Sequence, residues 1–154
     1  MTRCADCWRR QASVVTEIGH YELGEKPDRP QALTATYDGT NLVVTVVENG
    51  RTLTLVSRVH LPESGEGPFP VMIGANSTPS AEAFANWIRI PFNTGDVSAY
   101  SWGTPDFTTH PFYILYPELL GEGQYTAWSW GISRLIDGIE IVAGQIGADI
   151  ERMG

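Results

Sequence analysis

The stretch Tyr125-Thr-Ala-Trp-Ser-Trp-Gly-Ile-Ser-Arg-Leu-Ile-Asp-Gly-Ile-Glu140 has the pattern of an amphipathic helix. Its apolar side chains recur three and four residues apart, so they share one stripe. The stripe consists of Trp128, Ile132, Leu135, Ile136, Ile139 and Val142. We therefore expect a helix from residue 126 to about 142. Trp128 lies on the stripe and is expected in the core, whereas Trp130 lies off it and is expected against a neighbouring segment.

Two turn signals divide the first third of the chain into β-rich runs. Asp38-Gly39 and Asn49-Gly50 accept the positive φ angles that type I′ turns require, so both predict hairpins. The strands they join are expected at residues 32–37, 41–48 and 52–61. Alternation of apolar and polar residues in the third run predicts an antiparallel sheet with one wetter face.

Further strands are expected before the helix. The uninterrupted apolar run Val71-Met-Ile-Gly74 suits a strand buried on both faces. Residues 81–86 are expected to form a helical turn, and residues 87–92 another strand that ends near Pro91. Residues 93–125 have no clear period and predict a long loop with a turn of helix around 112–119. Residues 8–23 predict a short helix and an irregular loop.

Composition excludes two classes of partner. The chain has 154 residues, enough for one domain, and its 18 acidic against 10 basic side chains give a formal net charge of -8. Lys and Arg are scattered, so nucleic acid and anionic membranes are not expected as partners. No apolar run approaches the ~20 residues that cross a bilayer. The first residues lack the apolar stretch of a secretory signal.

Cys4 and Cys7 form a Cys-x-x-Cys pair. One such pair supplies half of a structural zinc site at most, and a redox dithiol would need a βαβ context that does not follow. A plain structural role or a disulfide is the favoured interpretation, with redox and metal roles as alternatives. No spacing elsewhere suggests a metal or an organic cofactor.

Hairpins, a buried strand, another strand, a long loop and an amphipathic helix follow one another as in the first part of an α/β-hydrolase sheet. Four motifs in matching order resemble those of the glucuronoyl esterases, a family of α/β-hydrolases. The motifs are Tyr21-Glu-Leu-Gly24 before two prolines, Gly67-Pro-Phe-Pro70, Phe112-Tyr-Ile-Leu-Tyr116, and Thr126-Ala-Trp-Ser-Trp-Gly131 followed by Arg134, Ile136 and Asp137.

The resemblance implies a three-layer α/β-hydrolase domain over residues 1–154, truncated before the nucleophile strand. It also implies a secreted serine esterase that cleaves esters between lignin alcohols and (4-O-methyl-)glucuronic acid on xylan, without a cofactor. In the family a Gly-Cys-Ser-Arg turn follows this helix, and the acidic and His partners come later. No Gly-x-Ser-x-Gly or Gly-Cys-Ser occurs in this chain. No catalytic residue is therefore assigned, and the chain alone is expected to be inactive.

The residues that follow the first buried strand are the remaining site candidates. Backbone N–H groups of Gly74, Ala75 and Asn76 lie where hydrolases often build part of an oxyanion hole, although a plain tight turn explains them as well. Asn76-Ser77-Thr78 is also an N-glycosylation sequon. His20, His60 and His110 are isolated histidines with no Ser or Cys at an evident elbow.

Two further expectations concern the chain as a whole. Without strands beyond the final helix, the sheet would have an open edge, the helix would lack partners on one face, and the chain would tend to associate or unfold. The alternative function is a non-catalytic carbohydrate-binding module or an interaction fragment completed by a partner chain. Arg134 and Asp137, three residues apart on the helix, are expected to form an ion pair.

Overall fold

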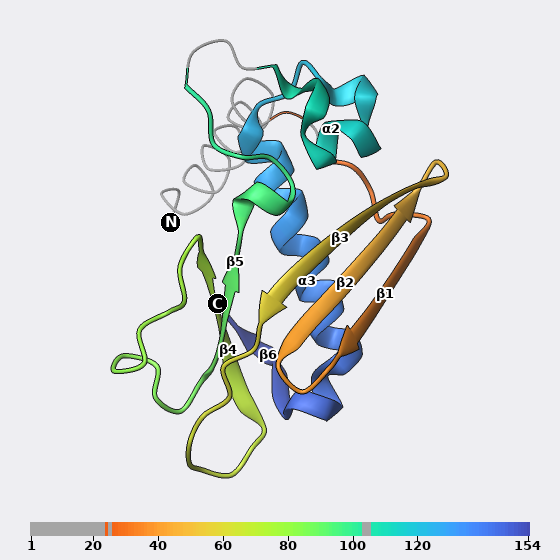
Figure 1. Ribbon diagram of the computed structural model, residues 1–154. Helices are drawn as coiled ribbons and strands as arrows, with labels where there is room; N and C mark the ends of the chain where they lie inside the picture. The colour runs from red at the N-terminus through yellow and green to blue at the C-terminus, as the bar shows by residue number, and fades with distance from the viewer. Residues whose placement is uncertain (1–23, 25, 103–105) are drawn as a thin grey trace, which may run out of the picture.

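The computed structural model describes residues 24, 26–102 and 106–154. Strands β1 (Ala32–Tyr37), β2 (Asn41–Glu48) and β3 (Arg51–Arg58) form the expected antiparallel sheet (Figure 1). The pattern of residues buried in β3 follows the predicted alternation. The helix expected within residues 8–23 lies outside the described residues.

The two hairpin turns differ in type. Asn49 and Gly50 both have positive φ, of 50° and 72°, and they lie between the paired residues Glu48 and Arg51, so the predicted type I′ turn is confirmed there. The hairpin predicted at Asp38-Gly39 is confirmed, but its type I′ turn is not, because Asp38 does not have a positive φ. The last pair is Tyr37 with Leu42, which leaves a four-residue loop. The Asp38 carboxylate closes this loop by accepting bonds from the N–H groups of the two residues after Gly39.

A second, parallel sheet has the order β5-β4-β6 and consists of β4 (Phe69–Ala75), β5 (Ile88–Phe92) and β6 (Ala148–Met153). His60 and Arg89 exchange two backbone hydrogen bonds of 3.0 Å, which join the segment after β3 to β5. This isolated antiparallel bridge links the two three-stranded sheets. The last residues, expected only to approach a strand, already form β6, because pairing with β4 satisfies their backbone groups.

Helical structure is more extensive than the sequence predicts. The helix α3 (Gln124–Ile146) ends at Gly147, whose φ of 68° suits a left-handed cap. The turn of helix predicted around residues 112–119 is confirmed, but the described residues of the range 93–125 form more helical structure than that turn. They contain α2 (Pro111–Leu115) and three short 3-10 helices, η2 (Thr94–Asp96), η3 (Phe107–Thr109) and η4 (Pro117–Leu119). Residues 81–86 form the expected turn, in which Phe84 N–H donates to the carbonyl oxygen of Ser80 four residues earlier.

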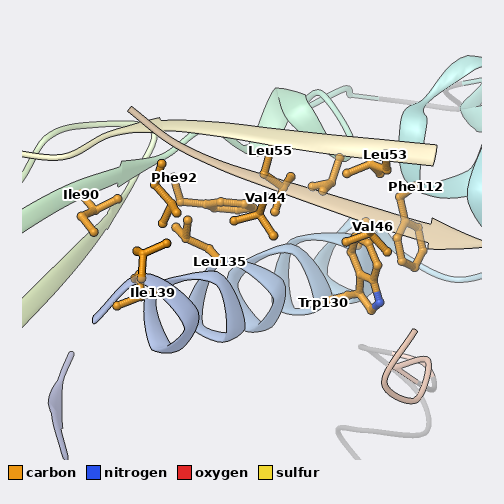
Figure 2. Packing of buried hydrophobic residues seen from close by; sticks show 14 of the residues in the cluster. Val44, Val46, Leu53, Leu55, Ile90, Phe92, Phe112, Trp130, Leu135 and Ile139 are labelled. Carbon is orange, nitrogen blue, oxygen red and sulfur yellow. The ribbon is translucent and has the colours of Figure 1, made fainter. Parts of the chain in front are cut away.

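The core lies between α3 and the sheet. Figure 2 shows Leu135 and Ile139 of α3 pointing toward side chains of the strands, among them Val44 and Phe92. Two glycines set the distance between the layers. A Cβ on Gly138 would lie 2.2 Å from a methyl carbon of Val44, and one on Gly131 would lie 2.6 Å from the ring of Phe92. Only glycine permits this approach.

The packing of Trp130 against a neighbouring segment is confirmed, whereas Trp128, expected in the core, only packs against it. Trp130 is fully buried, whereas Trp128 is only partly buried. The rings of Phe112 and Tyr116 lie 5.5 and 5.6 Å from the Trp130 ring, so α2 and the residue after it provide a second wall. Helix α3 packs on two sides, and a sequence pattern with one apolar stripe predicts only one buried side. In the described part of the chain, no helix has the length and apolar character needed to cross a membrane.

Candidate functional site

The candidate oxyanion loop lies where β4 ends. Gly74 is the last residue but one of the strand, and a Cβ there would lie 2.3 Å from the carbonyl oxygen of Ser77. The chain therefore folds back tightly onto the strand, which requires glycine at this position. Asn76 has a φ of 56°, the left-handed conformation that asparagine adopts more readily than most residues.

Asn76 connects the carboxyl ends of β4 and β5. Its N–H donates to the carbonyl oxygen of Phe92 at 2.7 Å. Its side-chain Oδ1 accepts from both the N–H and the hydroxyl of Thr94, each at 2.9 Å. Thr94 is buried and begins η2. The loop after β4 is therefore held in place by the residues that follow β5.

The residues after β5 hold η2 through a second asparagine. Asn93 caps this short helix, since its Oδ1 accepts from Gly95 N at 3.1 Å and its Nδ2 donates to Asp96 at 2.8 Å. Burial raises the pKa of Asp96 above its ordinary value, while its hydrogen bonds act in the opposite direction. Perturbed carboxylates often mark functional sites. Here the carboxylate takes part in the structure of η2, and neither Asp96 nor Thr94 was singled out from the sequence.

These contacts limit what the loop can offer an anion. An oxyanion hole needs backbone N–H groups that are free to donate. The N–H of Asn76 is used by Phe92, so Asn76 can position the loop but does not supply this donor. An open hollow lies beside it, lined by Asn76, Ser77, Thr78, Pro91, Phe92 and Asn93.

The described histidines do not form a catalytic pair with an accessible nucleophile. His110 Nδ1 lies 2.8 Å from Ser98 Oγ, but Ser98 is fully buried and cannot reach a substrate. The Asp106 carboxylate accepts from Thr108 instead of orienting the imidazole. Burial lowers the pKa of His60, and the positive charges of Arg89 and Arg58 lower it further.

Metal-binding geometry is absent from the described ranges. Among residues 24, 26–102 and 106–154, no three His, Cys, Asp or Glu side chains are placed to hold one ion. Cys4, Cys7 and His20 lie outside these ranges.

The predicted ion pair on the final helix is confirmed. Arg134 Nε lies 2.8 Å from Asp137 Oδ2, and Arg29 Nη2 lies 3.2 Å from the other oxygen of the same carboxylate. The Arg134 side chain is only 8% exposed, and its guanidinium lies 5.8 Å from the centre of the Trp130 ring. The pair is therefore part of the packing of α3, unlike an exposed pair on a helix surface.

A protein-family model described as "Glucuronyl esterase, fungi" matches residues 44–154, most of the chain. The chain belongs to the glucuronyl esterase family. Its relatives include 4-O-methyl-glucuronoyl methylesterases from two fungi. The protein of Hypocrea jecorina is 37% identical over 135 residues, which are 88% of this chain and 29% of that protein. The protein of Podospora anserina is 32% identical over 155 residues, with 100% of this chain and 32% of the relative covered.

Solved structures of glucuronoyl esterases share the fold of this family member. The catalytic domain from Hypocrea jecorina has a TM-score of 0.80 at 35% identity, covering 94% of this chain and 39% of that one. A Sporotrichum thermophile enzyme in complex with methyl 4-O-methyl-beta-D-glucopyranuronate has a TM-score of 0.79 at 34% identity, with the same coverage. The α/β-hydrolase architecture is thereby confirmed. The chain spans about a third of the length of the curated relatives it matches.

Proposed function

We propose that this chain is the first part of a carboxylic ester hydrolase of the glucuronoyl esterase type. The substrate class is an ester of (4-O-methyl-)glucuronic acid carried on xylan, with a lignin alcohol as the leaving group. The observation that carries the proposal is the match of residues 44–154 to the family, together with the shared fold over 94% of the chain. A methyl glucuronate ester bound to one of these relatives supports the substrate class.

The position of β6 suggests where the chemistry takes place. In α/β-hydrolases the nucleophilic serine lies on a sharp turn at the carboxyl end of a central strand, followed by a helix. Strand β6 runs parallel to β4, so its carboxyl end lies at the same edge of the sheet as Asn76. We assign β6 as the strand that leads to the serine. The serine, the acid and the histidine then belong to sequence beyond residue 154, and the present residues alone are inactive.

The loop after β4 would contribute to this mechanism through its backbone. The serine attacks the ester carbonyl as histidine takes its proton, and the resulting oxyanion needs N–H donors until the alcohol leaves. Gly74 and Ala75 end β4 immediately before the turn that would face this centre, and Asn76 holds that turn through Phe92 and Thr94. The role of these three residues is thus support of the oxyanion loop.

Secretion also belongs to the proposal. An extracellular enzyme would allow a disulfide between Cys4 and Cys7 and a glycan on Asn76. The Asn76 side chain is exposed, and glycosylation at Nδ2 would leave Oδ1 able to accept from Thr94. A glycan on Asn76 is therefore compatible with the contacts that hold the loop.

The test is a protein that we call the joined enzyme. It consists of this chain followed by the part of the Hypocrea jecorina esterase that lies beyond the matched segment. The joined enzyme should hydrolyse methyl 4-O-methyl-glucuronate, and the 154-residue chain should not. A serine-to-alanine change in the added part should abolish turnover and serves as the control. A folded joined enzyme that cleaves no glucuronate ester would contradict the proposal.

A further inference from the structure

A row of aromatic side chains lies where the loop after β5 meets the start of α3. Trp102 is 85% exposed, Tyr125 is 61% exposed and Tyr100 is 56% exposed. The ring of Tyr100 lies 5.5 Å from that of Trp102 and 6.1 Å from that of Trp128. Trp128 in turn lies 5.1 Å from Tyr125. We call these four residues the aromatic surface.

Hydrogen bonds hold the loop that carries this surface. The indole N–H of Trp128 donates to the carbonyl oxygen of Ser98 at 2.7 Å. The side chain of Gln124 accepts from Ser101 N at 3.3 Å and donates to the carbonyl oxygen of Ala99. Both neighbours of Tyr100 are thus fixed to the first turns of α3. The exposed rings are presented from a held backbone, so little order has to be gained when a ligand binds.

The rings of the aromatic surface are not stacked face to face, and three of them remain exposed to solvent. Tyr100 and Trp102 meet at 85°, and Tyr125 and Trp128 meet at 79°, so the contacts are edge to face. Neighbouring exposed aromatics of this kind contribute little to the core and mark interaction sites. Aromatic faces pack on apolar surface, and tyrosine hydroxyls also donate and accept hydrogen bonds. A pyranose ring offers both an apolar C–H face and hydroxyl groups.

The charge of the chain and the position of the aromatic surface limit the chemical classes of ligand that can bind there. The chain carries a net charge of -8 and the four side chains are neutral, which disfavours a polyanion. A row of rings suits a ligand that repeats the same flat unit. The surface follows β5, and ligands of open α/β sheets bind beyond the carboxyl ends of the strands.

We propose that the aromatic surface binds a neutral pyranose oligosaccharide, the backbone of the xylan that carries the ester. The choice of xylan rests on the proposed function, whereas the choice of a neutral sugar chain rests on the surface itself. Trp102 makes the largest contribution because it is the most exposed of the rings. Tyr100 and Tyr125 extend the contact to adjacent sugar units.

Xylohexaose is the probe, because it carries no ester and its binding does not depend on catalysis. Titration calorimetry with the 154-residue chain, and in parallel with the joined enzyme, should give saturable binding. Trp102→Ala should raise Kd about tenfold, as loss of a central aromatic contact does. Tyr125→Ala should act in the same direction. Trp87→Ala is the matched control, since Trp87 is partly buried and packs against Phe84 at 5.6 Å, apart from the aromatic surface.

The outcomes separate this proposal from the proposed function. An unchanged Kd in Trp102→Ala, with an unchanged Tm, would overturn it. Binding of a phenolic lignin alcohol through Trp102 without binding of xylohexaose would also overturn it, and would assign the surface to the leaving group. Binding of xylohexaose through Trp102 by a joined enzyme without esterase activity would support the surface and refute the proposed function alone.

Discussion

The side of α3 that faces β2 is closed, whereas the side that faces β4 and β6 is open. On the closed side Val44 and Leu135 are fully buried, and Gly138 allows the layers to approach. On the open side Ile132 and Ile136 are only partly buried and line a hollow. Its other lining residues are Ile73, Ala75, Met153 and Gly154. The first side is complete within the described residues, and the second keeps apolar surface at the edge of the sheet.

The open side of α3 corresponds to the open sheet edge that the sequence predicts. Within the described ranges β6 pairs with β4 alone, and the hollow beside it is largely apolar. In a complete α/β sheet such a surface is covered by further strands and helices. The closed side should therefore determine the stability of the chain, and the open side its tendency to associate. The following substitutions test that division, with stability measured by chemical denaturation of the chain and of the joined enzyme.

The largest effect is expected at Trp130, where α3 packs against α2. Trp130→Ala removes a fully buried ring and should lower the free energy of unfolding by ~3–5 kcal/mol. Trp102→Ala, at the most exposed ring, is the control and should change it by less than ~0.5 kcal/mol. Similar losses for the two variants would show that the second wall of the helix is not formed.

Gly138 tests the close approach of helix and sheet. Gly138→Val places atoms where Val44 already lies and should destabilise by about 1–3 kcal/mol. Gly144→Ala, on the same helix, has nothing within 4 Å of the added Cβ. This control should stabilise the helix by up to ~1 kcal/mol, because alanine has the higher helix propensity. A neutral Gly138→Val would mean that the layers lie further apart.

Asn76 tests the connection between β4 and β5. Asn76→Ala removes both hydrogen bonds to Thr94 and places a non-glycine residue without a polar side chain at a φ of 56°. The expected loss is about 1–2 kcal/mol. Asn76→Gly restores the backbone freedom alone, so it should recover part of the loss. If the two variants are equally destabilised, the backbone conformation contributes nothing; if Asn76→Gly is as stable as the unchanged chain, the side-chain bonds contribute nothing.

Ile136 tests the open side. Ile136→Ser should cost less than ~1 kcal/mol in the 154-residue chain and should reduce self-association, measured by sedimentation. In the joined enzyme the same change should cost more, because added chain would cover the hollow. Leu135→Ser, its neighbour on the closed side, should cost several kcal/mol in both proteins, of the order of ~3. Equal effects of Ile136→Ser in both proteins would contradict the difference between the two sides.

The smallest effects concern pH. Asp96 has a pKa raised chiefly by burial, so its contribution to stability is present below its unfolded pKa and is lost as pH rises through the folded pKa. Asp96→Asn should therefore stabilise the chain at neutral pH and be neutral in acid. Asp38 has a pKa lowered by N–H bonds from Asn41 and Thr40, so Asp38→Asn should destabilise at neutral pH only. Tm measured against pH distinguishes the two signs.

Much of the fold could be predicted from local sequence. The three antiparallel strands, the two central strands and the long helix were expected from alternation, turn residues and apolar spacing. Leu135, Ile139 and Val142 of the predicted stripe are buried as expected, but the centre of the buried face is shifted toward Gly131 and Gly138, because an apolar pattern does not count glycine as a core residue. Within residues 93–125 the turn of helix around 112–119 was expected, whereas η2 and η3 were missed, since each is too short to show a period.

The candidate site also has a part that could be predicted from the sequence and a part that could not. The loop of Gly74, Ala75 and Asn76 could be proposed because it follows a buried apolar run. Its connection to Thr94 could not, because the two residues are distant in sequence and only the parallel pairing of β4 with β5 brings them together. The aromatic surface likewise depends on a loop and a helix turn that meet through Gln124 and Trp128.

The sequence by itself determined the family, the order of most strands and the final helix, because motifs and periodicity are local properties. Only the tertiary structure decided the pairing of β6 with β4, the burial of Trp130 in place of Trp128, and the exposure of Trp102. These features depend on which surfaces meet after the chain has folded. Contacts between segments that are distant in sequence decide which apolar side chains are buried and which remain exposed to solvent.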